Sequence, residues 1–558
     1  MTDGEPPAAD WRQDEHRTRP GQDQARGWGR GRGRVVAAVD QGTTGTTVCL
    51  LDEQAVVVGR GYTPVRPGFP RPGWVEQDPE QLWRSVVEAV QAALADAGRA
   101  PSDLAALGIT NQRETTLVWD RRTSTPVYPA IVWQDRRTAV HCERLAADGH
   151  GPWVADRSGL VLDPYFSATK LAWILAHDPE LRRRAGRGEL AAGTVDSWLI
   201  WRLTGGATHV TDITNASRTQ LLHLATGRWD DDLLGLFEIP DDLLPTVVPS
   251  SRVYATTDPA AFLGVRVPIA AAVGDQQAAL FAQGCHAPGQ AKNTYGTGSF
   301  VLVNTGVTVP GPESARAAGL LRTAAYQLDG QPVRYALEGA ILSTGSAVAW
   351  LRDGLGIVGD VAETAALAAS LAGNDGVYFV PALAGLGAPH WDPRARGTLL
   401  GLTRGTSRAH LARAVLEGIA YRTRDVVEAM AAAGFAVTEL RADGGAARNA
   451  WLMQFQADVL GIDVDVPDNI ETTALGSAYL AGLATGFFPD LDALSDLRRS
   501  ADRYRPATSP GQRARGYRRW RSALERSRAW ALDDDLDDGS DDRSDDRSDD
   551  RSESDRYQ

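Results

Sequence analysis

Three glycine-rich turns in the sequence have the composition of anion-binding sites. The segment 40–47, Asp-Gln-Gly-Thr-Thr-Gly-Thr-Thr, offers backbone N–H groups and hydroxyls, with the Asp40 carboxylate at its base for a hydrated Mg²⁺. For one turn alone, a hairpin without a ligand is the alternative. Gly296-Thr297-Gly298 and Gly444-Gly445 add two further turns close to predicted strands. Because a triphosphate needs contacts from several directions, the set favours a nucleotide phosphate site.

Polar side chains also follow two predicted strands. Arg113 and Glu114 lie just after the strand 107–110 and offer a donor fork beside an acceptor, which suits a polyhydroxylated substrate. Asp275 and Gln276 follow the apolar run 267–273 in the same way. The alternatives are a surface ion pair for the first segment and a helix N-cap for the second. Trp133 and Tyr165 could form an apolar wall of a substrate site, or they could be core residues.

The elements that must position these residues begin with a meander. Apolar runs predict strands at 35–39, 48–51 and 55–58. Asp78-Pro79 then gives an N-cap and a first-turn proline, and apolar residues at helical spacing continue to a stop at Gly98. With the strand 107–110, the first half alternates strand and helix.

A similar opening recurs in the middle of the chain. The run 267–273 ends at Asp275, and 294–304 places Gly296-Thr297-Gly298 before another apolar strand. We therefore expect two halves of one architecture, with a boundary in the segment 255–268. The sequence divides into an N-terminal tail (1–34), an N-terminal domain (35–262), a C-terminal domain (263–532) and an acidic tail (533–558).

Composition excludes several classes of protein. The 558 residues carry a net charge of −13, which disfavours nucleic-acid binding, and no run approaches the roughly 18 apolar residues of a membrane span. The polar N-terminus has no apolar signal segment, so we expect a cytoplasmic protein without membrane insertion. The three widely spaced cysteines suggest neither disulfides nor a thiolate metal site.

Two common nucleotide-binding motifs are also excluded. Lys170 and Lys292 are the only lysines, a scarcity that reads as genomic base composition, and neither follows a glycine, so no Walker A motif exists. The literal G-x-G-x-x-G at 354–359 follows a segment that looks like the end of a helix. A dinucleotide-binding fingerprint must follow a strand, so this glycine run is interpreted as a helix-terminating loop.

Taken in order, eight segments resemble the carbohydrate-kinase family that includes glycerol, xylulose and gluconate kinases, with the glycerol kinases the nearest match. They are Asp-Gln-Gly-Thr-Thr (40–44), Pro-Gly-Trp-Val-Glu (72–76), Thr-Asn-Gln-Arg-Glu-Thr-Thr (110–116), Asp-Pro-Tyr-Phe-Ser (163–167), Gly-Asp-Gln-Gln-Ala-Ala-Leu-Phe (274–281), Ala-Lys-Asn-Thr-Tyr-Gly-Thr-Gly (291–298), Gly-Leu-Gly-Ala-Pro (385–389) and Asp-Gly-Gly-Ala (443–446). The resemblance implies an α/β fold of two actin-like or ribonuclease H-like ATPase domains, with mixed sheets flanked by helices and a central cleft.

The same resemblance implies ATP-dependent phosphorylation of glycerol to sn-glycerol 3-phosphate, with Asp275 as the general base. The implied glycerol contacts are Arg113, Glu114, Tyr165, Asp275 and Gln276, with Trp133 packed on the carbon chain. The implied ATP contacts are Thr43, Thr44 and Gly45 at the terminal phosphates, Thr297 and Gly345 along the nucleotide, and Gly445 and Asn449 at the adenosine end. Asp40 and Asp275 would hold Mg²⁺ through water, and a homo-oligomer is expected.

Departures from the family pattern leave alternatives open. The family's first turn usually carries Arg where this chain has Thr47, and it often has Gln near the adenine where this chain has Ala349. Gly264-Val265-Arg266 only partly resembles a loop at which some bacterial glycerol kinases bind a sugar bisphosphate. A kinase for another polyol or ketose, and a nucleotide-binding regulatory paralogue with weakened catalysis, are therefore the alternatives.

Overall fold

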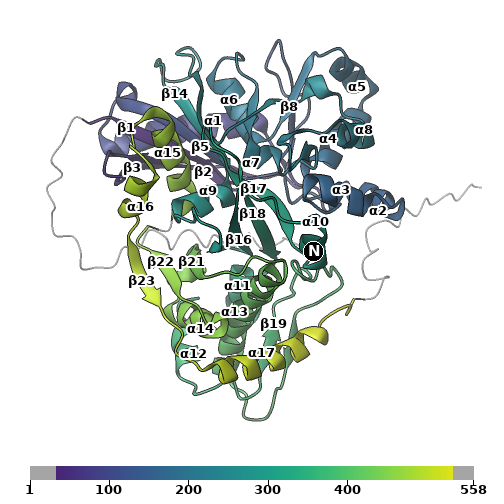
Figure 1. Ribbon diagram of the computed structural model, residues 1–558, viewed down its shortest axis with the longest axis vertical. Helices are drawn as coiled ribbons and strands as arrows, with labels where there is room; N and C mark the ends of the chain where they lie inside the picture. Colours follow the sequence, from purple (N-terminus) through teal and green to yellow (C-terminus); the bar gives the residue numbers. More distant parts are fainter. Residues whose placement is uncertain (1–32, 470, 532–558) are drawn as a thin grey trace, which may run out of the picture.

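The computed structural model describes residues 33–469 and 471–531, and these residues form two large mixed sheets (Figure 1). The predicted tails lie outside the described residues, except for 33 and 34. The first sheet has the order β13 (Ser251–Thr256), β14 (Pro268–Gly274), β5 (Leu104–Asn111), β1 (Val35–Gln41), β2 (Gly45–Leu51) and β3 (Val57–Pro64). The second has the order β17 (Leu321–Tyr326), β18 (Arg334–Ile341), β16 (Ser299–Gly306), β15 (Gln290–Tyr295), β21 (Glu439–Asp443), β22 (Val464–Pro467) and β23 (Ser500–Tyr504).

The two sheets repeat one topology, as the sequence predicts. An antiparallel meander, β1-β2-β3 in the first sheet and β15-β16-β18 in the second, is followed by two strands parallel to its first member. These parallel strands are β5 and β14 in one sheet and β21 and β22 in the other. An antiparallel edge strand, β13 or β23, completes each sheet.

One strand is not where the sequence interpretation places it. The run 267–273 is predicted to open the second half, but β14 pairs in parallel with β5 and belongs to the first sheet. That prediction is wrong because an apolar run carries no information about which sheet it joins. β13 and β14 therefore flank the predicted boundary within one sheet, and the chain enters the second sheet at β15. The domain limits 35–262 and 263–532 stay a prediction.

The third strand of the first meander begins later than predicted. Ala55 adopts a left-handed conformation with φ of 55°, in a turn where the Asp52 carboxylate accepts hydrogen bonds from the backbone of Gln54 and Val56. The strand β3 consequently starts at Val57. Asp and Asn side chains close such turns readily, and a pattern of apolar residues alone does not reveal them.

Helix α1 (Pro79–Ala97) confirms the capping signals in the sequence. The Asp78 carboxylate accepts a hydrogen bond from the Glu80 N–H, and Gly98 ends the helix in the left-handed conformation. The buried face of α1, including Leu82, Val86 and Val90, packs in the core on one face of the first sheet. The capping residues thus fix both ends of a helix whose apolar stripe fixes its position.

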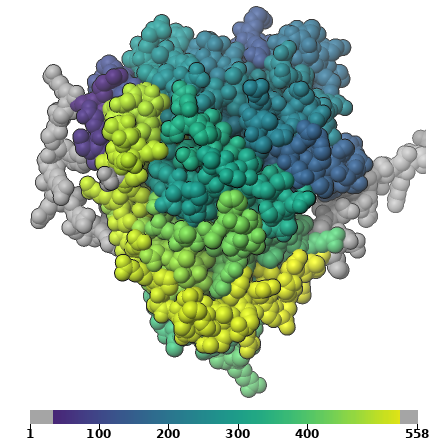
Figure 2. Space-filling view, in the orientation of Figure 1, coloured from purple at the N-terminus to yellow at the C-terminus, as the bar shows by residue number. Residues whose placement is uncertain are grey.

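Other helices cover the sheets or join them. α9 (Asp275–Ala282) and α15 (Thr472–Thr485) contribute to one core with β1, β5, β14, β16 and β18, so this core connects the two halves. Figure 2 shows the yellow-green segment of α15 and α16 against the purple N-terminal residues, while the yellow α17 lies at the bottom of the view. The remaining α-helices are α2 (Ala139–Ala147), α3 (His150–Ser158), α4 (Ser167–His177), α5 (Pro179–Gly186), α6 (Val195–Leu203), α7 (Ile213–Ala216), α8 (Asp231–Phe237), α10 (Pro312–Ala317), α11 (Gly345–Ala349), α12 (Glu363–Ala369), α13 (Arg408–Ala432), α14 (Ala450–Leu460), α16 (Leu491–Leu497) and α17 (Pro510–Glu525).

Five two-stranded sheets complete the described structure. They are β10 (Leu222–His223) with β11 (Arg228–Trp229), β12 (Thr246–Val248) with β9 (Val210–Asp212), β19 (Tyr378–Val380) with β20 (Thr398–Leu400), β4 (Glu76–Gln77) with β7 (Ala130–Ile131), and β6 (Leu117–Asp120) with β8 (Leu190–Gly193). In residues 33–469 and 471–531, no helix combines the length and apolar character needed to cross a membrane. All three cysteines are buried and free.

Candidate active site

Strand register brings the first glycine-rich turn and Asp275 to the same edge of the first sheet. β5 lies between β1 and β14, and Asn111 is paired with Gln41 on one side and with Gly274 on the other. The turn 42–44 follows Gln41 directly, and Asp275 follows Gly274. Since neighbouring strands lie about 4.8 Å apart, the two chain segments leave the sheet only about 10 Å from each other.

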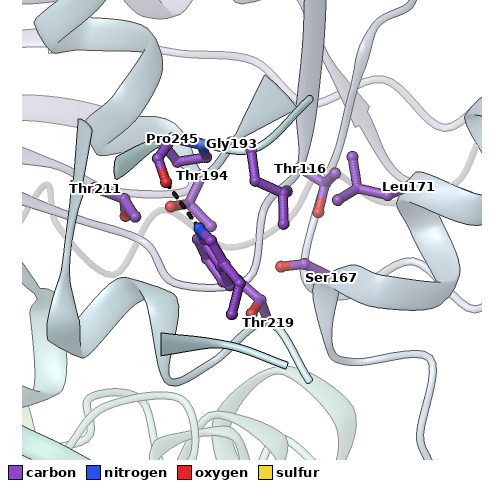
Figure 3. A pocket seen from close by; sticks show the side chains of 10 residues that line it. Thr116, Ser167, Leu171, Gly193, Thr194, Thr211, Thr219 and Pro245 are labelled. Carbon is purple, nitrogen blue, oxygen red and sulfur yellow. Dashed lines mark hydrogen bonds between the residues drawn. The ribbon is translucent and has the colours of Figure 1, made fainter. Parts of the chain in front are cut away.

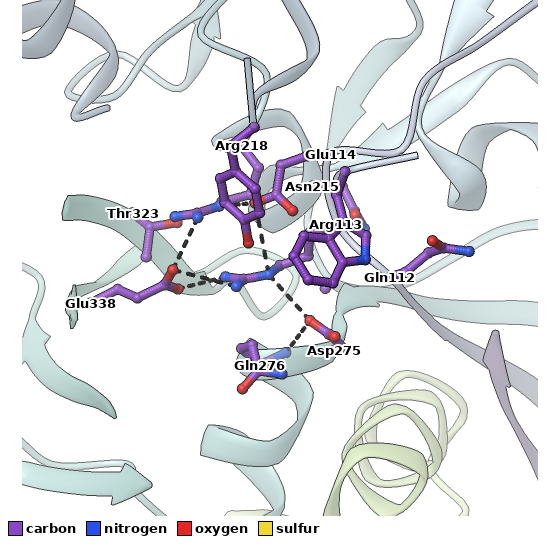
Figure 4. Close-up of polar contacts among 12 residues, drawn as sticks. Gln112, Arg113, Glu114, Asn215, Arg218, Asp275, Gln276, Thr323 and Glu338 are labelled. Atoms are coloured by element: carbon purple, nitrogen blue, oxygen red, sulfur yellow. Dashed lines mark hydrogen bonds and ion pairs between the residues drawn. The ribbon is translucent and has the colours of Figure 1, made fainter. Parts of the chain in front are cut away.

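A cluster of buried charges continues this edge (Figure 4). The Arg113 guanidinium places Nε 3.1 Å from Asp275 Oδ1, and its Nη1 donates to Glu338 Oε2 at 2.5 Å. Arg218 donates from Nε to Glu114 Oε1 at 2.6 Å and from Nη2 to Glu338 Oε1 at 3.0 Å. The predicted pair Arg113–Glu114 is therefore not a surface ion pair, because both side chains are almost fully buried.

Sequence reasoning missed two members of this cluster, Arg218 and Glu338. Glu338 lies on β18 of the second sheet, so its bonds to Arg113 and Arg218 join the two halves. Burial alone raises the pKa of a carboxyl group, but the two neighbouring guanidinium groups outweigh burial and lower the pKa of Glu338 to about 2. The one available signal was a charged residue inside the otherwise buried, apolar strand 334–341.

Glu114 combines buried charge with an unusual backbone. Its φ of 64° lies in the left-handed region, which costs a non-glycine residue about 1–3 kcal/mol and often marks a functional site. Thr116 and Ser167 donate hydrogen bonds to its carbonyl oxygen and hold this conformation. These two residues also line a small buried cavity of about 10 Å³, room for about one water molecule (Figure 3).

Asp275 is the most accessible carboxylate of the cluster. Its side chain is 29% exposed, whereas those of Glu114 and Glu338 are at most 1% exposed. The N-cap residue of α9 is Gly274, so Asp275 is the first residue of the helix and the N-cap interpretation of the sequence is wrong. Asp275 therefore presents a carboxylate that is held by Arg113 on one side and open on another.

A second network supports the backbone before Asp275. The Thr214 hydroxyl donates to Asp212 Oδ1 at 2.9 Å and accepts a hydrogen bond from the Gly274 N–H at 2.8 Å. Asp212 is fully buried, and desolvation together with the nearby charge of Asp196 raises its pKa to about 7. This network was not predicted, because its members are separated by 60 residues along the chain.

The two predicted aromatic residues meet beside the turn 42–44. The rings of Trp133 and Tyr165 pack edge to face with centroids 5.7 Å apart, and Trp133 Nε1 donates to the Thr43 hydroxyl at 2.9 Å. Thr44 at the tip of the turn is exposed, while Gly45 is buried. Trp133 thus borders the turn, and the Tyr165 ring beside it lies 5.9 Å from the Arg218 guanidinium of the charged cluster.

The other four predicted nucleotide residues, Thr297, Gly345, Gly445 and Asn449, lie at the matching edge of the second sheet. The Gly345 N–H donates to the Gly296 carbonyl oxygen at 2.9 Å, and the Thr344 N–H donates to the Thr297 carbonyl oxygen at 2.9 Å. A Cβ at Gly345 would lie 2.6 Å from the Gly296 oxygen, so this close approach requires glycine. The exposed Thr297 and the half-buried Gly298 border the turn.

A third turn lies against the same strand. Gly444 has a φ of 86°, and a Cβ there would lie 2.5 Å from the Tyr295 carbonyl oxygen. Gly445 is exposed, and Asn449 caps α14 by accepting from the Leu452 N–H while donating to the Thr364 hydroxyl at 3.2 Å. The structure thus places Thr297, Gly345, Gly445 and Asn449 at one edge of the second sheet and Thr43, Thr44 and Gly45 at the edge of the first.

The residues available for a metal ion fit hydrated Mg²⁺ better than a closed metal site. Among the described residues, no group of three or more His, Cys, Asp or Glu side chains is arranged to hold a metal. Asp40 is the penultimate residue of strand β1, just before the turn 42–44, and Asp275 lies on the adjoining segment. Mg²⁺ keeps several waters and binds one or two carboxylates with substrate phosphates, which matches this sparse donor set.

The structure also locates the glycine run 354–359 and the two positions, Thr47 and Ala349, at which this chain departs from the family pattern. The glycine run 354–359 follows the helix α11 and a single π-helical turn, which confirms that it is no dinucleotide fingerprint. Thr47 pairs with Asp40 in the β1–β2 ladder, so it lies next to the phosphate-type turn. Ala349 ends α11, the helix that begins at Gly345.

Comparison with known proteins agrees with this geometry. The model of the FGGY family of carbohydrate kinases, N-terminal domain, matches residues 35–282, and the C-terminal domain model matches residues 291–485. Glycerol kinase 2 of Thermotoga maritima is 51% identical over 498 residues, and the glycerol kinase of Trichlorobacter lovleyi is 53% identical over 497; each alignment covers 89% of this chain and 99% of the relative. The Plasmodium falciparum glycerol kinase structure with ADP superposes with a TM-score of 0.82 at 34% identity, covering 88% of this chain and 98% of that one. This chain belongs to the FGGY family of carbohydrate kinases.

Proposed function

We propose that this chain phosphorylates glycerol, transferring the γ-phosphoryl group of ATP to a terminal hydroxyl and releasing ADP and sn-glycerol 3-phosphate. The observation that carries the proposal is the row Gln41–Asn111–Gly274 across three neighbouring strands. It sets a threonine-lined turn and an accessible carboxylate at one sheet edge, about two strand spacings apart. About half of the residues are identical to glycerol kinases along nearly their full length, which selects glycerol among the acceptors.

Asp275 is the proposed general base. Its carboxylate is open on one side, and Arg113 fixes its orientation through the 3.1 Å contact to Oδ1. As the glycerol oxygen forms its bond to phosphorus, the bond to the β–γ bridging oxygen breaks and the hydroxyl proton passes to Asp275. Positioning supplies much of the rate in such transfers, so the buried partners of Arg113 contribute by holding this geometry.

The acceptor side is proposed to consist of side chains around the charged cluster. Glycerol hydroxyls would bind Arg113, Glu114, Tyr165 and Gln276, with the Trp133 ring against the carbon chain. Burial raises the pKa of the Tyr165 hydroxyl, so this group remains a neutral donor and acceptor at physiological pH. A neutral hydroxyl beside fixed charges suits a substrate that is itself neutral and rich in hydroxyls.

The nucleotide side is proposed to use backbone groups. Thr43, Thr44 and Gly45 would meet the terminal phosphates, Thr297 and Gly345 would line the nucleotide, and Gly445 with Asn449 would hold its adenosine end. Mg²⁺ would be held through water by Asp40 and Asp275 and would offset phosphate charge when bound. Removal of divalent ions by a chelator is expected to abolish turnover, and added Mg²⁺ is expected to restore it.

A coupled ADP-release assay with and without glycerol tests the function. We expect glycerol-dependent ADP release and a higher kcat/KM for glycerol than for xylulose, gluconate or other polyols. A ranking led by another acceptor would make this chain a kinase for that substrate. ATP binding in calorimetry without glycerol-dependent ADP release would instead support a regulatory, noncatalytic role. The proposal also includes a homo-oligomer in the cytoplasm, which light scattering of the purified protein and cell fractionation test.

A further inference from the structure

The two lysines of this arginine-rich chain occupy related places in the structure. Of 58 Lys and Arg residues, only Lys170 and Lys292 are lysines. The sequence interpretation treats this scarcity as a matter of base composition. Both lysines are nevertheless fully buried, at 0% exposure, and each donates a hydrogen bond to a residue of the proposed glycerol site. Composition explains why lysines are rare, but it does not explain these two positions.

Lys292 reaches the acceptor side from the second sheet. Its ammonium group, carried by β15, donates to Gln276 Oε1 and to the Thr294 hydroxyl at 2.8 Å. An ammonium group is only a donor, so it fixes which end of the Gln276 carboxamide faces it. The carbonyl end is bound to Lys292, and the NH₂ end is left to donate to another acceptor. Gln276 also follows Asp275 directly in the chain, and its backbone N–H donates to Asp275 Oδ1 at 2.7 Å.

Lys170 supports the opposite side of the same site. It lies on α4, and its ammonium group donates to the Tyr165 carbonyl oxygen at 2.6 Å. Tyr165 begins the connection into that helix, and its ring packs edge to face on Trp133. The lysine thus fixes the backbone that carries one predicted glycerol contact, as Lys292 fixes the side chain of another.

We infer that Lys170 and Lys292 are positioning residues of the acceptor site, holding Tyr165 and Gln276 so that Gln276 donates through Nε2 to a substrate hydroxyl oxygen. This inference rests on the proposed function. A guanidinium group is no substitute at either place, because it brings five N–H donors in a fixed plane to a space that contains partners for one compact ammonium group. Replacing either lysine by arginine is therefore expected to weaken glycerol binding.

Burial has the expected effect on both ammonium groups. Desolvation lowers the pKa of Lys170 and of Lys292 to about 8, although nearby carboxylates oppose the shift. Both groups are mainly protonated near neutral pH and can donate the hydrogen bonds seen in the structure.

The first experiment is a double-mutant cycle on Lys292 and Gln276 in the full-length enzyme. Lys292→Met and Gln276→Ala are each expected to raise KM for glycerol by about tenfold, while KM for ATP changes less than about twofold, because each loses one hydrogen bond to a charged or substrate group. The double variant is expected to resemble the single variants, since the lysine acts through Gln276. Additive effects on KM for glycerol would overturn the inference.

A second variant keeps the test decisive if Lys292→Met does not fold. Gln276→Glu retains an oxygen for Lys292 and removes the NH₂ donor, so it is expected to fold and to lose glycerol affinity to the same extent as Gln276→Ala. Wild-type affinity for glycerol in this variant would overturn the assigned orientation. An inactive wild-type enzyme would contradict the proposed function instead, so the two failures are distinguishable.

The arginine exchanges complete the test. Lys292→Arg and Lys170→Arg keep a positive charge and are each expected to raise KM for glycerol several-fold, with thermal melting used to confirm the fold. The matched control is Arg84→Lys, which exchanges the same two residue types at a side chain that is 58% exposed. This variant is expected to leave the KM values for glycerol and for ATP unchanged. Arginine variants with wild-type KM for glycerol would show that the two lysines have no positioning role.

Discussion

The two sheets share a strand order, but their corresponding ends are built from different chemical groups. In the first sheet, the turn after β1 and the segment after β5 present threonine, arginine and glutamate side chains. In the second, the turn after β15 and the segment after β21 present glycine and backbone N–H and C=O groups. Under the proposed function, the first sheet would meet glycerol through side chains and the terminal phosphates through the turn 42–44, and the second sheet would meet the rest of the nucleotide through close backbone approach.

The two ends also differ in how charge is buried. The first half contributes Arg113, Glu114, Arg218 and Asp275 to the described cluster, whereas the second half contributes Glu338. Changes at the charged cluster should therefore alter glycerol chemistry, and changes at the glycine turns of the second sheet should alter nucleotide affinity. The β1–β2 hairpin belongs to the first sheet but is proposed to meet the phosphates, so changes there should also affect ATP. Variants at each end either separate these effects or show that the comparison is wrong.

The largest expected effect is at the carboxylate of the first sheet. Asp275→Asn removes the proposed proton acceptor and is expected to lower kcat by about 10³-fold, within the range of general-base contributions. The measurement is the coupled ADP-release assay, with thermal melting to show that the fold is retained. An asparagine variant with wild-type turnover would exclude Asp275 as the base.

The next effect concerns the carboxylate that joins the halves. Glu338→Gln leaves Arg113 and Arg218 with less compensating charge in a buried site and is expected to lower the free energy of unfolding by about 3–5 kcal/mol. Denaturant titration measures the change. Glu428→Gln is the control, because Glu428 is 53% exposed and its ion pair with Arg424 at the surface is worth at most about 1 kcal/mol. Equal losses in the two variants would contradict the role of the cluster.

The same carboxylate predicts a pH dependence. Since the folded-state pKa of Glu338 is lowered to about 2, its contribution is fully present above the unfolded value of about 4.3 and is lost as the pH falls towards 2. The wild-type free energy of unfolding should therefore fall in this window. Glu338→Gln should lack that part of the decrease; an unchanged pH profile would show that another group is responsible.

A smaller effect is expected at the glycine turns of the second sheet. Gly345→Ala places a Cβ 2.6 Å from the Gly296 carbonyl oxygen and is expected to shift the turn, raising KM for ATP by about tenfold. KM for glycerol should change less than about twofold, the reverse of the pattern expected for Gln276→Ala. Steady-state kinetics with each substrate varied in turn checks both values. Equal increases in KM for ATP and KM for glycerol would contradict the proposal that the glycine turns of the second sheet bind the nucleotide and not the acceptor.

The smallest effect is at the position where the family usually has arginine. Thr47 lies beside Asp40 in the β1–β2 ladder, so Thr47→Arg adds a cation near the proposed phosphate turn. A partly exposed ion pair of up to about 1 kcal/mol predicts an increase in kcat/KM for ATP of up to about fivefold. Thr47→Gln, which is long but neutral, is the control and should show no increase. Equal behaviour of the two variants would show that charge is not what this position lacks.

Local signals in the sequence predicted much of the fold. Asp78, Pro79 and Gly98 define α1 because caps and special backbone conformations depend on neighbouring residues. The strand placed in the wrong half shows the limit of such signals. β14 pairs with β5 across more than 150 residues of intervening chain, and an apolar run does not specify a distant partner.

The candidate site shows the same limit. Arg113, Glu114 and Asp275 were found because they follow strands at the end where α/β sheets place ligands. Arg218 and Glu338 were missed because their contacts join residues 104 to 225 positions apart. The buried Glu338 inside an apolar strand was the one local anomaly that pointed to a partner, and only the structure names that partner.

Glu338 has a consequence for motion during turnover. It is bonded to arginines of the opposite half, so a rotation that separated it from both would strand buried charges at a cost of about 3–5 kcal/mol. Under the proposed function, a movement of one half against the other would therefore be expected to pivot near this ion cluster, so that the acceptor side keeps its geometry while the parts farther from the cluster move.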